Sequence, residues 1–195
     1  NIAEITSAID WLGRPGRSQL NLLHCTSSYP TGLKEANVRA IETMQREFQY
    51  PIGFSDHTEG FISALLAYGM GSRIFEKHLT LSRDLAGPDH QASADPADFR
   101  RYVVALRDAE TAIGSGHKVP TPTELINIPV VRRRIVAARA LAVGQILAED
   151  DVVFLRADSG IMAEEWGRIR GVALQNGLAT GESLEFDHVD SGRPR

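Results

Sequence analysis

Helix-like and strand-like segments alternate along the first 113 residues of the chain. The helix-like segments span residues 2–12, 34–48 and 60–70, and the strand-like segments span residues 20–24, 51–54 and 73–79. A further helix is expected to begin at Asp95-Pro96, because Asp is a preferred N-cap residue and Pro is favoured in the first helical turn. This alternation predicts an α/β fold with parallel strands.

The alternation ends at a segment rich in proline and glycine, which follows the last of these helices. Residues 114–131 are therefore predicted to be a linker between two domains. Beyond them, short β-like pieces separated by glycines predict a small β-rich domain over residues 132–195. In the helix before the linker, the spacing of the apolar residues predicts an inward-facing stripe. Its members are Phe99, Val103, Leu106 and Ile113.

Composition and charge exclude several classes of function. The formal net charge is -4, so no basic field favours nucleic acid as a partner. No apolar run approaches the length of a membrane span, so we expect no membrane association. The first residues lack the pattern of a secretory signal peptide. Because the chain begins at Asn1 rather than Met, we expect it to belong to a longer gene product.

Cys25 is the single cysteine of the chain, so no intrachain disulfide can form. This usage is typical of a reducing compartment, and we expect a cytoplasmic protein. A neighbouring His24 suggests an activated thiolate, but adjacent side chains of a strand point to opposite faces. We therefore expect Cys25 to be a buried structural residue.

Two of the predicted strands end in clusters of polar residues. One runs into Ser55-Asp56-His57 and the next into Glu76-Lys77-His78. Because side chains alternate along a strand, Ser55 and His57 share one face, as do Glu76 and His78. In parallel α/β folds the ligand site lies at the carboxyl ends of the strands.

Two imidazoles with a carboxylate nearby predict a divalent-metal site that leaves positions open for water or substrate. A metal held in this way could polarise a carbonyl oxygen as a Lewis acid. The alternative is that His57 and His78 are hydrogen-bonded polar residues with no metal, which is the commoner role of such histidines. Ser55, Asp56 and His57 do not form a catalytic triad, because adjacent strand residues point opposite ways. From this chemistry alone, the chain is an α/β enzyme whose metal dependence stays open.

Four sequence motifs resemble those of the sialic-acid synthases. They are LLHCTSSYP at 22–30, GFSDHT at 53–58, FEKHLT at 75–80 and GPDHQAS at 87–93. One such match would be weak, but four in the same order with compatible gaps are specific. The C-terminal domain resembles the antifreeze-like (SAF) domain of the same enzymes, so the resemblance covers nearly the whole chain.

The resemblance implies an α/β fold made of the C-terminal portion of a (β/α)8 TIM barrel followed by a small β-rich SAF domain. A complete barrel needs about 250 residues. The strands before the linker would then be the last three of eight. The family's N-terminal half, with the lysines that bind phosphate, would be absent.

The resemblance also implies the activity. These enzymes condense phosphoenolpyruvate with N-acetylmannosamine or a related N-acyl amino sugar, and they release phosphate to give a nonulosonic (sialic) acid. A divalent metal, Mn²⁺ or Mg²⁺, polarises the sugar aldehyde. The family forms a domain-swapped homodimer, in which each small domain covers the site of the partner.

Motif matches assign roles to individual residues. The metal ligands would be His57 and His78, and the active-site carboxylates would be Glu76 and Asp89. The substrate contacts would be Ser27, Tyr29, Ser55 and Arg156, of which Ser55 would contact phosphoenolpyruvate and Arg156 the sugar. Arg156 departs from the family pattern, because Ala157-Asp158 follow it where Pro-Gly is common.

Two alternative functions stay open. The first is a legionaminic acid synthase of the same chemistry; His24 and His90 argue against a pseudaminic acid synthase. The second is a non-catalytic sugar-binding remnant, against which the intact Glu76, His78 and Asp89 argue. In either case, we expect this chain alone to be inactive as a synthase.

Overall fold

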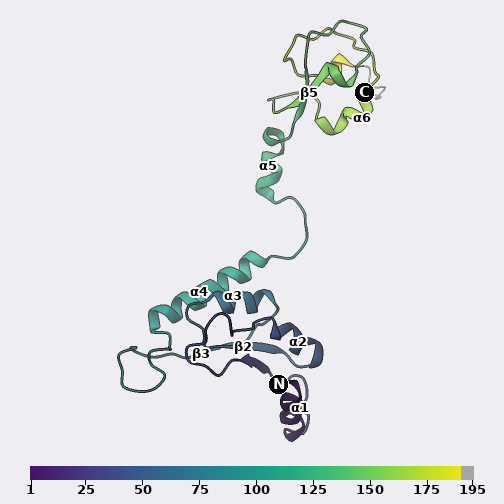
Figure 1. Cartoon of the computed structure of the whole chain (residues 1–195). Coiled ribbons are helices and arrows are strands. Elements are labelled where there is room, and N and C mark those ends of the chain that lie inside the picture. Colours follow the sequence, from purple (N-terminus) through teal and green to yellow (C-terminus); the bar gives the residue numbers. More distant parts are fainter. Residues whose placement is uncertain (190–195) are drawn as a thin grey trace. The chain divides into compact units, whose positions relative to one another are not determined.

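The computed structural model describes residues 1–189 and shows an α/β protein (Figure 1). The chain divides into two compact units, the first formed by residues 1–117 and the second beginning at Lys118. Each unit has its own cluster of buried apolar side chains. Such separate cores are the mark of separately folding domains.

A parallel sheet forms the centre of the first unit. Its strands are β1 (Leu22–Cys25), β2 (Ile52–Asp56) and β3 (Phe75–Lys77), in the order β1-β2-β3. Every residue of β2 is buried, whereas β1 and β3 lie at the edges of this sheet. The predicted α/β alternation with parallel strands is therefore confirmed.

Four helices accompany the sheet: α1 (Ile2–Trp11), α2 (Ala40–Glu47), α3 (Ile62–Gly69) and α4 (Pro96–Ile113). The predicted start of α4 is confirmed, because the Asp95 side chain accepts a hydrogen bond from the Asp98 amide and Pro96 occupies the first turn. Helix α2 begins six residues later than the apolar spacing indicates. The reason is local: Asn37 adopts a positive φ of 39°, which a right-handed helix cannot contain.

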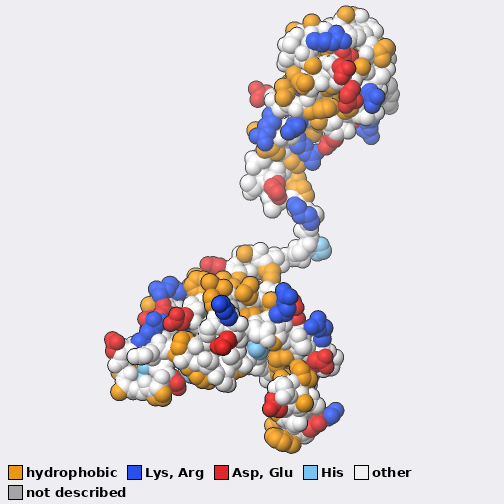
Figure 2. Space-filling view, viewed as in Figure 1, with side chains coloured by type: hydrophobic (Ala, Val, Ile, Leu, Met, Phe, Trp, Pro, Cys, Tyr) orange, Lys and Arg blue, Asp and Glu red, His pale blue; other side chains and the backbone are white. Residues whose placement is uncertain are grey.

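The inward face of α4 differs from the prediction. Tyr102 is buried, and Phe99 and Leu106 are half-buried, so the stripe that packs inward follows an i, i+3, i+7 spacing. Val103 and Ile113 are exposed, and the prediction was wrong for both. Helix α4 packs against α3. Apolar side chains remain exposed over α3 and α4 (Figure 2).

Gly53 lies where β2 passes between its neighbours. A Cβ atom on Gly53 would come within 2.4 Å of Leu23 Cδ2 and 2.6 Å of the Ile74 carbonyl oxygen. The second contact is with backbone, which cannot rotate away. The glycine is therefore required by close approach rather than by an unusual backbone angle.

We expect Gly53→Ala to lower the free energy of unfolding of the first unit by about 1–3 kcal/mol, as for other overpacked sites. Amide hydrogen exchange of β2 measures this loss directly. Gly69→Ala is the matched control, because a Cβ there would meet nothing and the residue ends a helix. Equal protection of β2 in the two variants would contradict the packing argument.

The second unit is built on an antiparallel pair of short strands, β4 (Arg134–Ala137) and β5 (Val152–Leu155). Up to residue 189, its other elements are α5 (Pro122–Val131), α6 (Trp166–Ile169) and three single-turn 3₁₀ helices, η1 (Glu149–Asp151), η2 (Ala163–Glu165) and η3 (Phe186–His188). The core includes Ile135, Leu147, Ile161, Leu174 and Leu184, all at most 2% exposed.

Helix α5 lies inside the segment predicted to be a linker. The side chain of Thr121 accepts a hydrogen bond from the Glu124 amide, and the Glu124 carboxylate accepts one from the Thr121 amide. This capping box, with Pro122 in the first turn, is a recognised helix start. None of the residues of α5 is buried. The helix therefore owes its presence to local capping rather than to packing.

Among the helices described for residues 1–189, none combines the length and the apolar character that crossing a membrane requires.

Candidate active site

The carboxyl ends of β2 and β3 bring four polar residues onto one face of the sheet. Ser55 and Glu76 are paired in the register of the two strands, and the Ser55 hydroxyl donates to Glu76 Oε1 at 2.6 Å. His57 and His78 follow one residue after each strand ends, and their ring centroids are 5.0 Å apart. The structure thus brings together Ser55, His57, Glu76 and His78, as strand alternation predicts.

His57 is held in a defined orientation and tautomer. Its Nδ1 lies 2.8 Å from the carbonyl oxygen of Thr26, which can only accept a hydrogen bond, so the proton is on Nδ1. In the neutral ring, Nε2 then carries a lone pair. A backbone carbonyl bonded to the second nitrogen is the usual way in which proteins orient a histidine that binds metal.

The space beside His57 Nε2 is lined by atoms that carry lone pairs. Ser55 Oγ lies 3.5 Å from Nε2, but the hydroxyl proton of Ser55 points to Glu76 Oε1. The serine oxygen, the imidazole nitrogen and the carboxylate therefore all present lone pairs to neighbouring space. Such a donor set fits a divalent cation better than it fits an anion.

An aromatic ring and a thiol complete this side of the sheet. The ring centroid of Tyr29 lies 4.3 Å from that of His57 and 5.1 Å from that of His78, and the tyrosine is 49% exposed. Cys25 Sγ lies 3.8 Å from His57 Nδ1. Cys25 is exposed, so the prediction of a buried structural cysteine was wrong. It is the last residue of β1, which lies at an edge of the three-stranded sheet.

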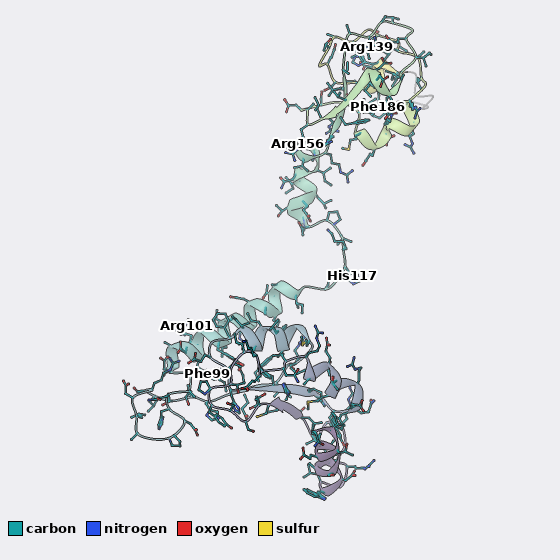
Figure 3. All side chains as sticks on the ribbon, in the orientation of Figure 1. Phe99, Arg101, His117, Arg139, Arg156 and Phe186 are labelled. Carbon is teal, nitrogen blue, oxygen red and sulfur yellow. The ribbon has the colours of Figure 1, made fainter. Side chains whose placement is uncertain are left out.

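The remaining predicted residues are all exposed. Ser27 is exposed on the loop after β1, and Asp89 is exposed on the loop after β3. Arg156 is exposed directly after β5 in the second unit (Figure 3). Within the described residues of the first unit, no hydrogen bond or ion pair joins the side chain of Ser27 or Asp89 to the histidine pair.

The loop that carries Asp89 has internal supports. His90 Nδ1 lies 2.8 Å from Thr80 Oγ1, and the Ser93 hydroxyl donates to the Asp89 carbonyl oxygen at 2.6 Å. Gly87 has a φ of +151°, and a Cβ there would come within 2.9 Å of His90 Cδ2. The motif that contains Asp89 therefore shapes the loop, whatever the carboxylate binds.

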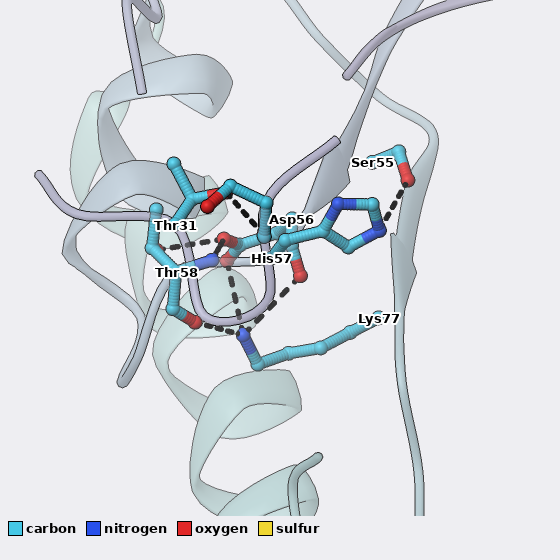
Figure 4. A network of polar contacts seen from close by, with 7 residues as sticks. Thr31, Ser55, Asp56, His57, Thr58 and Lys77 are labelled. Carbon is cyan, nitrogen blue, oxygen red and sulfur yellow. Dashed lines mark hydrogen bonds and ion pairs between the residues drawn. The ribbon is translucent and has the colours of Figure 1, made fainter. Parts of the chain in front are cut away.

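The opposite face of the same strand ends carries a polar group that we did not predict (Figure 4). Lys77 Nζ lies 3.4 Å from Asp56 Oδ2, and both side chains are almost wholly buried. Burial raises the pKa of the nearby Tyr102 phenol, and the negative charge of Asp56 raises it further. Asp56 and Lys77 occupy the positions between the residues chosen for the site, so the same alternation contained the signal.

Comparison with known proteins gives the family. Residues 1–118 match the NeuB family, and residues 132–190 match the SAF domain. The N,N'-diacetyllegionaminic acid synthase of Legionella pneumophila is 40% identical over 98% of this chain and 55% of its own length. The human N-acetylneuraminate-9-phosphate synthase is 33% identical over 70% of this chain and 38% of its own.

A solved structure agrees with these matches. The N-acetylneuraminic acid (sialic acid) synthetase of Leptospira borgpetersenii superposes with a TM-score of 0.57 and 36% identity, over 66% of this chain and 45% of that one. The chain spans about half the length of the curated relatives that match most of it. The fold, the order of the motifs and these matches lead to one conclusion: the chain belongs to the NeuB family and carries a SAF domain.

Proposed function

We propose that this chain is the C-terminal part of a nonulosonic acid synthase that condenses phosphoenolpyruvate with an N-acyl amino sugar and releases phosphate. The observation that carries the proposal is the group formed by Ser55, His57, Glu76 and His78 at the carboxyl ends of neighbouring parallel strands. This is the edge of the sheet at which parallel α/β enzymes bind their substrates.

His57 and His78 would hold the divalent cation. Their ring centroids lie 5.0 Å apart, and in the neutral His57 ring Nε2 carries the lone pair that a metal would take. Residues 1–189 contain no group of three or more His, Cys, Asp or Glu residues arranged to hold a metal ion, so water or substrate would complete the coordination. When bound, Mn²⁺ or Mg²⁺ would supply Lewis-acid polarisation of the sugar aldehyde.

The residues of the chain would share the remaining tasks. Ser55 would contact phosphoenolpyruvate, and Glu76, which already accepts the Ser55 hydrogen bond, would orient the water that adds at C2. Tyr29 covers one side of both imidazoles, and there it would limit the access of bulk water. Ser27, Asp89 and Arg156 would contact the sugar. In such a division the protein contributes positioning and fixed dipoles rather than covalent chemistry.

Two sugars are candidates. N-acetylmannosamine is the substrate that the four motifs imply. The legionaminic-type precursor is favoured by the 40% identity to the Legionella enzyme over nearly the whole chain, against 33% over a shorter stretch for the human N-acetylneuraminate-9-phosphate synthase.

The decisive experiment uses a synthase of the relatives' length that contains this sequence. Phosphate release from phosphoenolpyruvate is followed with each sugar in turn, and the products are weighed by mass spectrometry. We expect sugar-dependent phosphate release with Mn²⁺ present, and a product whose mass equals sugar plus pyruvate. Absence of condensation with every N-acyl amino sugar would contradict the proposed function.

The 195-residue chain alone is expected to show no turnover in the same assay. Its sheet ends in β1 and β3, and unpaired strand edges beside exposed apolar surface favour association with other chains. Size-exclusion chromatography should therefore show oligomers or poor recovery. Turnover by the chain alone at a rate close to that of the longer protein would overturn this prediction.

A further inference from the structure

A buried charged pair lies directly behind the two histidines, on the opposite face of the sheet (Figure 4). Asp56 is 1% exposed, and the Lys77 side chain is 7% exposed. Placing charges where water cannot reach them costs free energy unless each has close polar partners. The polar partners of Asp56 and Lys77 are mostly backbone and side-chain groups next to His57.

Lys77 Nζ binds the backbone on both sides of His57. It donates to the Thr58 carbonyl oxygen at 2.6 Å and lies 3.5 Å from the Asp56 carbonyl oxygen. Its ammonium also lies 5.2 Å from the centroid of the Tyr102 ring, at the distance of a cation–π contact. The Lys77 side chain thus spans from β3 to the end of β2.

The carboxylate of Asp56 fixes the same stretch of backbone. Asp56 Oδ1 accepts hydrogen bonds from the Thr58 amide at 2.9 Å and from the Thr58 hydroxyl at 2.7 Å. The chain at His57 is therefore held from before and from after. We call Asp56, Thr58 and Lys77 the anchor.

The register places the anchor where it can set the distance between the imidazoles. Asp56 and Lys77 are partners in the pairing of β2 with β3, and His57 and His78 are the next residue of each strand end. We propose that the anchor is a positioning device: it locks the ends of β2 and β3 together so that His57 and His78 face one another. The backbone pairing of β2 with β3 ends at Asp56 and Lys77. Beyond these residues, the Lys77 ammonium can connect the two strand ends where backbone hydrogen bonds no longer do.

The proposal rests on the proposed function in one respect, the assignment of the two histidines as metal ligands. The geometry itself can be measured without metal. The Nδ1 proton of His57 is bonded to the Thr26 carbonyl, so in the wild type it should exchange slowly with water. This proton reports whether His57 keeps its place.

The test uses the complete synthase that contains this chain, labelled with ¹⁵N-histidine. Lys77→Met keeps the length of the side chain and removes its charge. We expect exchange of the His57 Nδ1 proton to rise by at least about tenfold and Mn²⁺ affinity to fall by about 10–100-fold, the usual loss when support of a metal ligand is removed.

A second variant guards against simple unfolding. Lys77→Met alone leaves the Asp56 carboxylate buried without its cation, which is strongly destabilising. The double variant Asp56→Asn/Lys77→Met removes both charges and should fold better than Lys77→Met. It still lacks the hydrogen bond from Lys77 to the Thr58 carbonyl oxygen. Thr58→Val is milder still and removes only the hydroxyl that donates to Asp56. We expect all folded variants to show faster exchange at His57.

Ile41→Ala is the control for lost stability. Ile41 is fully buried in the core of the first unit and belongs to no polar contact of the anchor. It should lower stability while keeping the His57 proton protected and the Mn²⁺ affinity unchanged. If Ile41→Ala and the double variant behave alike, or if the folded double variant keeps wild-type exchange and affinity, the anchor has no positioning role.

The two proposals fail in different ways. A wild-type protein that does not bind Mn²⁺ would overturn the metal assignment, and the proton exchange would still decide on the anchor. Normal Mn²⁺ binding with unaltered exchange in the variants would overturn the anchor alone.

Discussion

Replacing His57 or His78 by alanine is expected to weaken Mn²⁺ binding by at least about 100-fold, because loss of a ligand exceeds the 10–100-fold loss seen when only its support is removed. Condensation activity should fall by a similar factor or more. The two ring centroids lie 5.0 Å apart, and neither imidazole belongs to the apolar core of the first unit. The fold should therefore survive either change.

Isothermal titration with Mn²⁺ and the phosphate-release assay measure the two effects on the same preparations. His117→Ala is the matched control, because His117 is exposed at the end of the first unit and touches no site residue (Figure 3). Its affinity and activity should equal those of the wild type. Full activity of His57→Ala, or of the wild type in excess chelator, would contradict metal assistance.

The face of the sheet that holds the site could be predicted from the sequence because it depends on a local rule. Side chains alternate along any strand, so Ser55 and His57 had to share a face once β2 was recognised. The closeness of Ser55 to Glu76 needs one further fact, the register of β2 and β3. Both strands end in a similar polar cluster, so a register that pairs Ser55 with Glu76 is the simplest one to expect.

Burial could not be predicted in the same way, because it depends on what covers each element. Cys25 is a residue type that is usually buried, yet it ends an edge strand and is exposed. Val103 has the spacing of an inward residue, yet it is exposed and its neighbour Tyr102 is buried. Composition and hydrophobic periodicity describe one segment at a time, whereas the burial of a side chain depends on which other elements pack against that segment.

The burial of the anchor residues could not be predicted from the sequence either. Asp56 and Lys77 are charged, and charged residues are usually exposed. Nothing in the sequence therefore indicates that either side chain is buried. Only the pairing of β2 with β3 brings the two charges to 3.4 Å, and only the course of the chain after β2 brings the Thr58 carbonyl to Lys77. A buried pair of this kind becomes visible when strand register and loop path are both known.

Arg156 lies in the second unit, so the subunit whose site it serves has to be established separately. It is exposed directly after β5, and its planar guanidinium can donate several hydrogen bonds to sugar oxygens while staying charged. The segment between α4 and α5 contains Pro120, and Pro122 opens α5, none of whose residues is buried. We expect Pro120, Pro122 and the capped helix α5 to restrict this connection enough to hold the small domain away from the barrel of its own subunit.

We propose that Arg156 acts in trans, at the site of a second subunit in a domain-swapped homodimer. An exchange of this kind is isologous and closes as a two-fold dimer. Arg156→Ala alone should reduce condensation mainly by raising the KM for the sugar, since the arginine would bind substrate rather than reacting atoms. Phosphoenolpyruvate binding should change little.

Complementation between two impaired subunits, assayed at a sugar concentration well below the KM of the Arg156→Ala variant, distinguishes trans from cis. An Arg156→Ala subunit is mixed with a His57→Ala subunit in the complete synthase, and the dimers are allowed to exchange. If Arg156 acts in trans, one of the two sites in each heterodimer joins an intact histidine pair to an intact arginine. If all dimers exchange freely, half are heterodimers with one working site, so about one quarter of the wild-type activity should return. If Arg156 acts in cis, every site keeps one defect and the mixture stays as weak as its parents, which would refute the swapped arrangement.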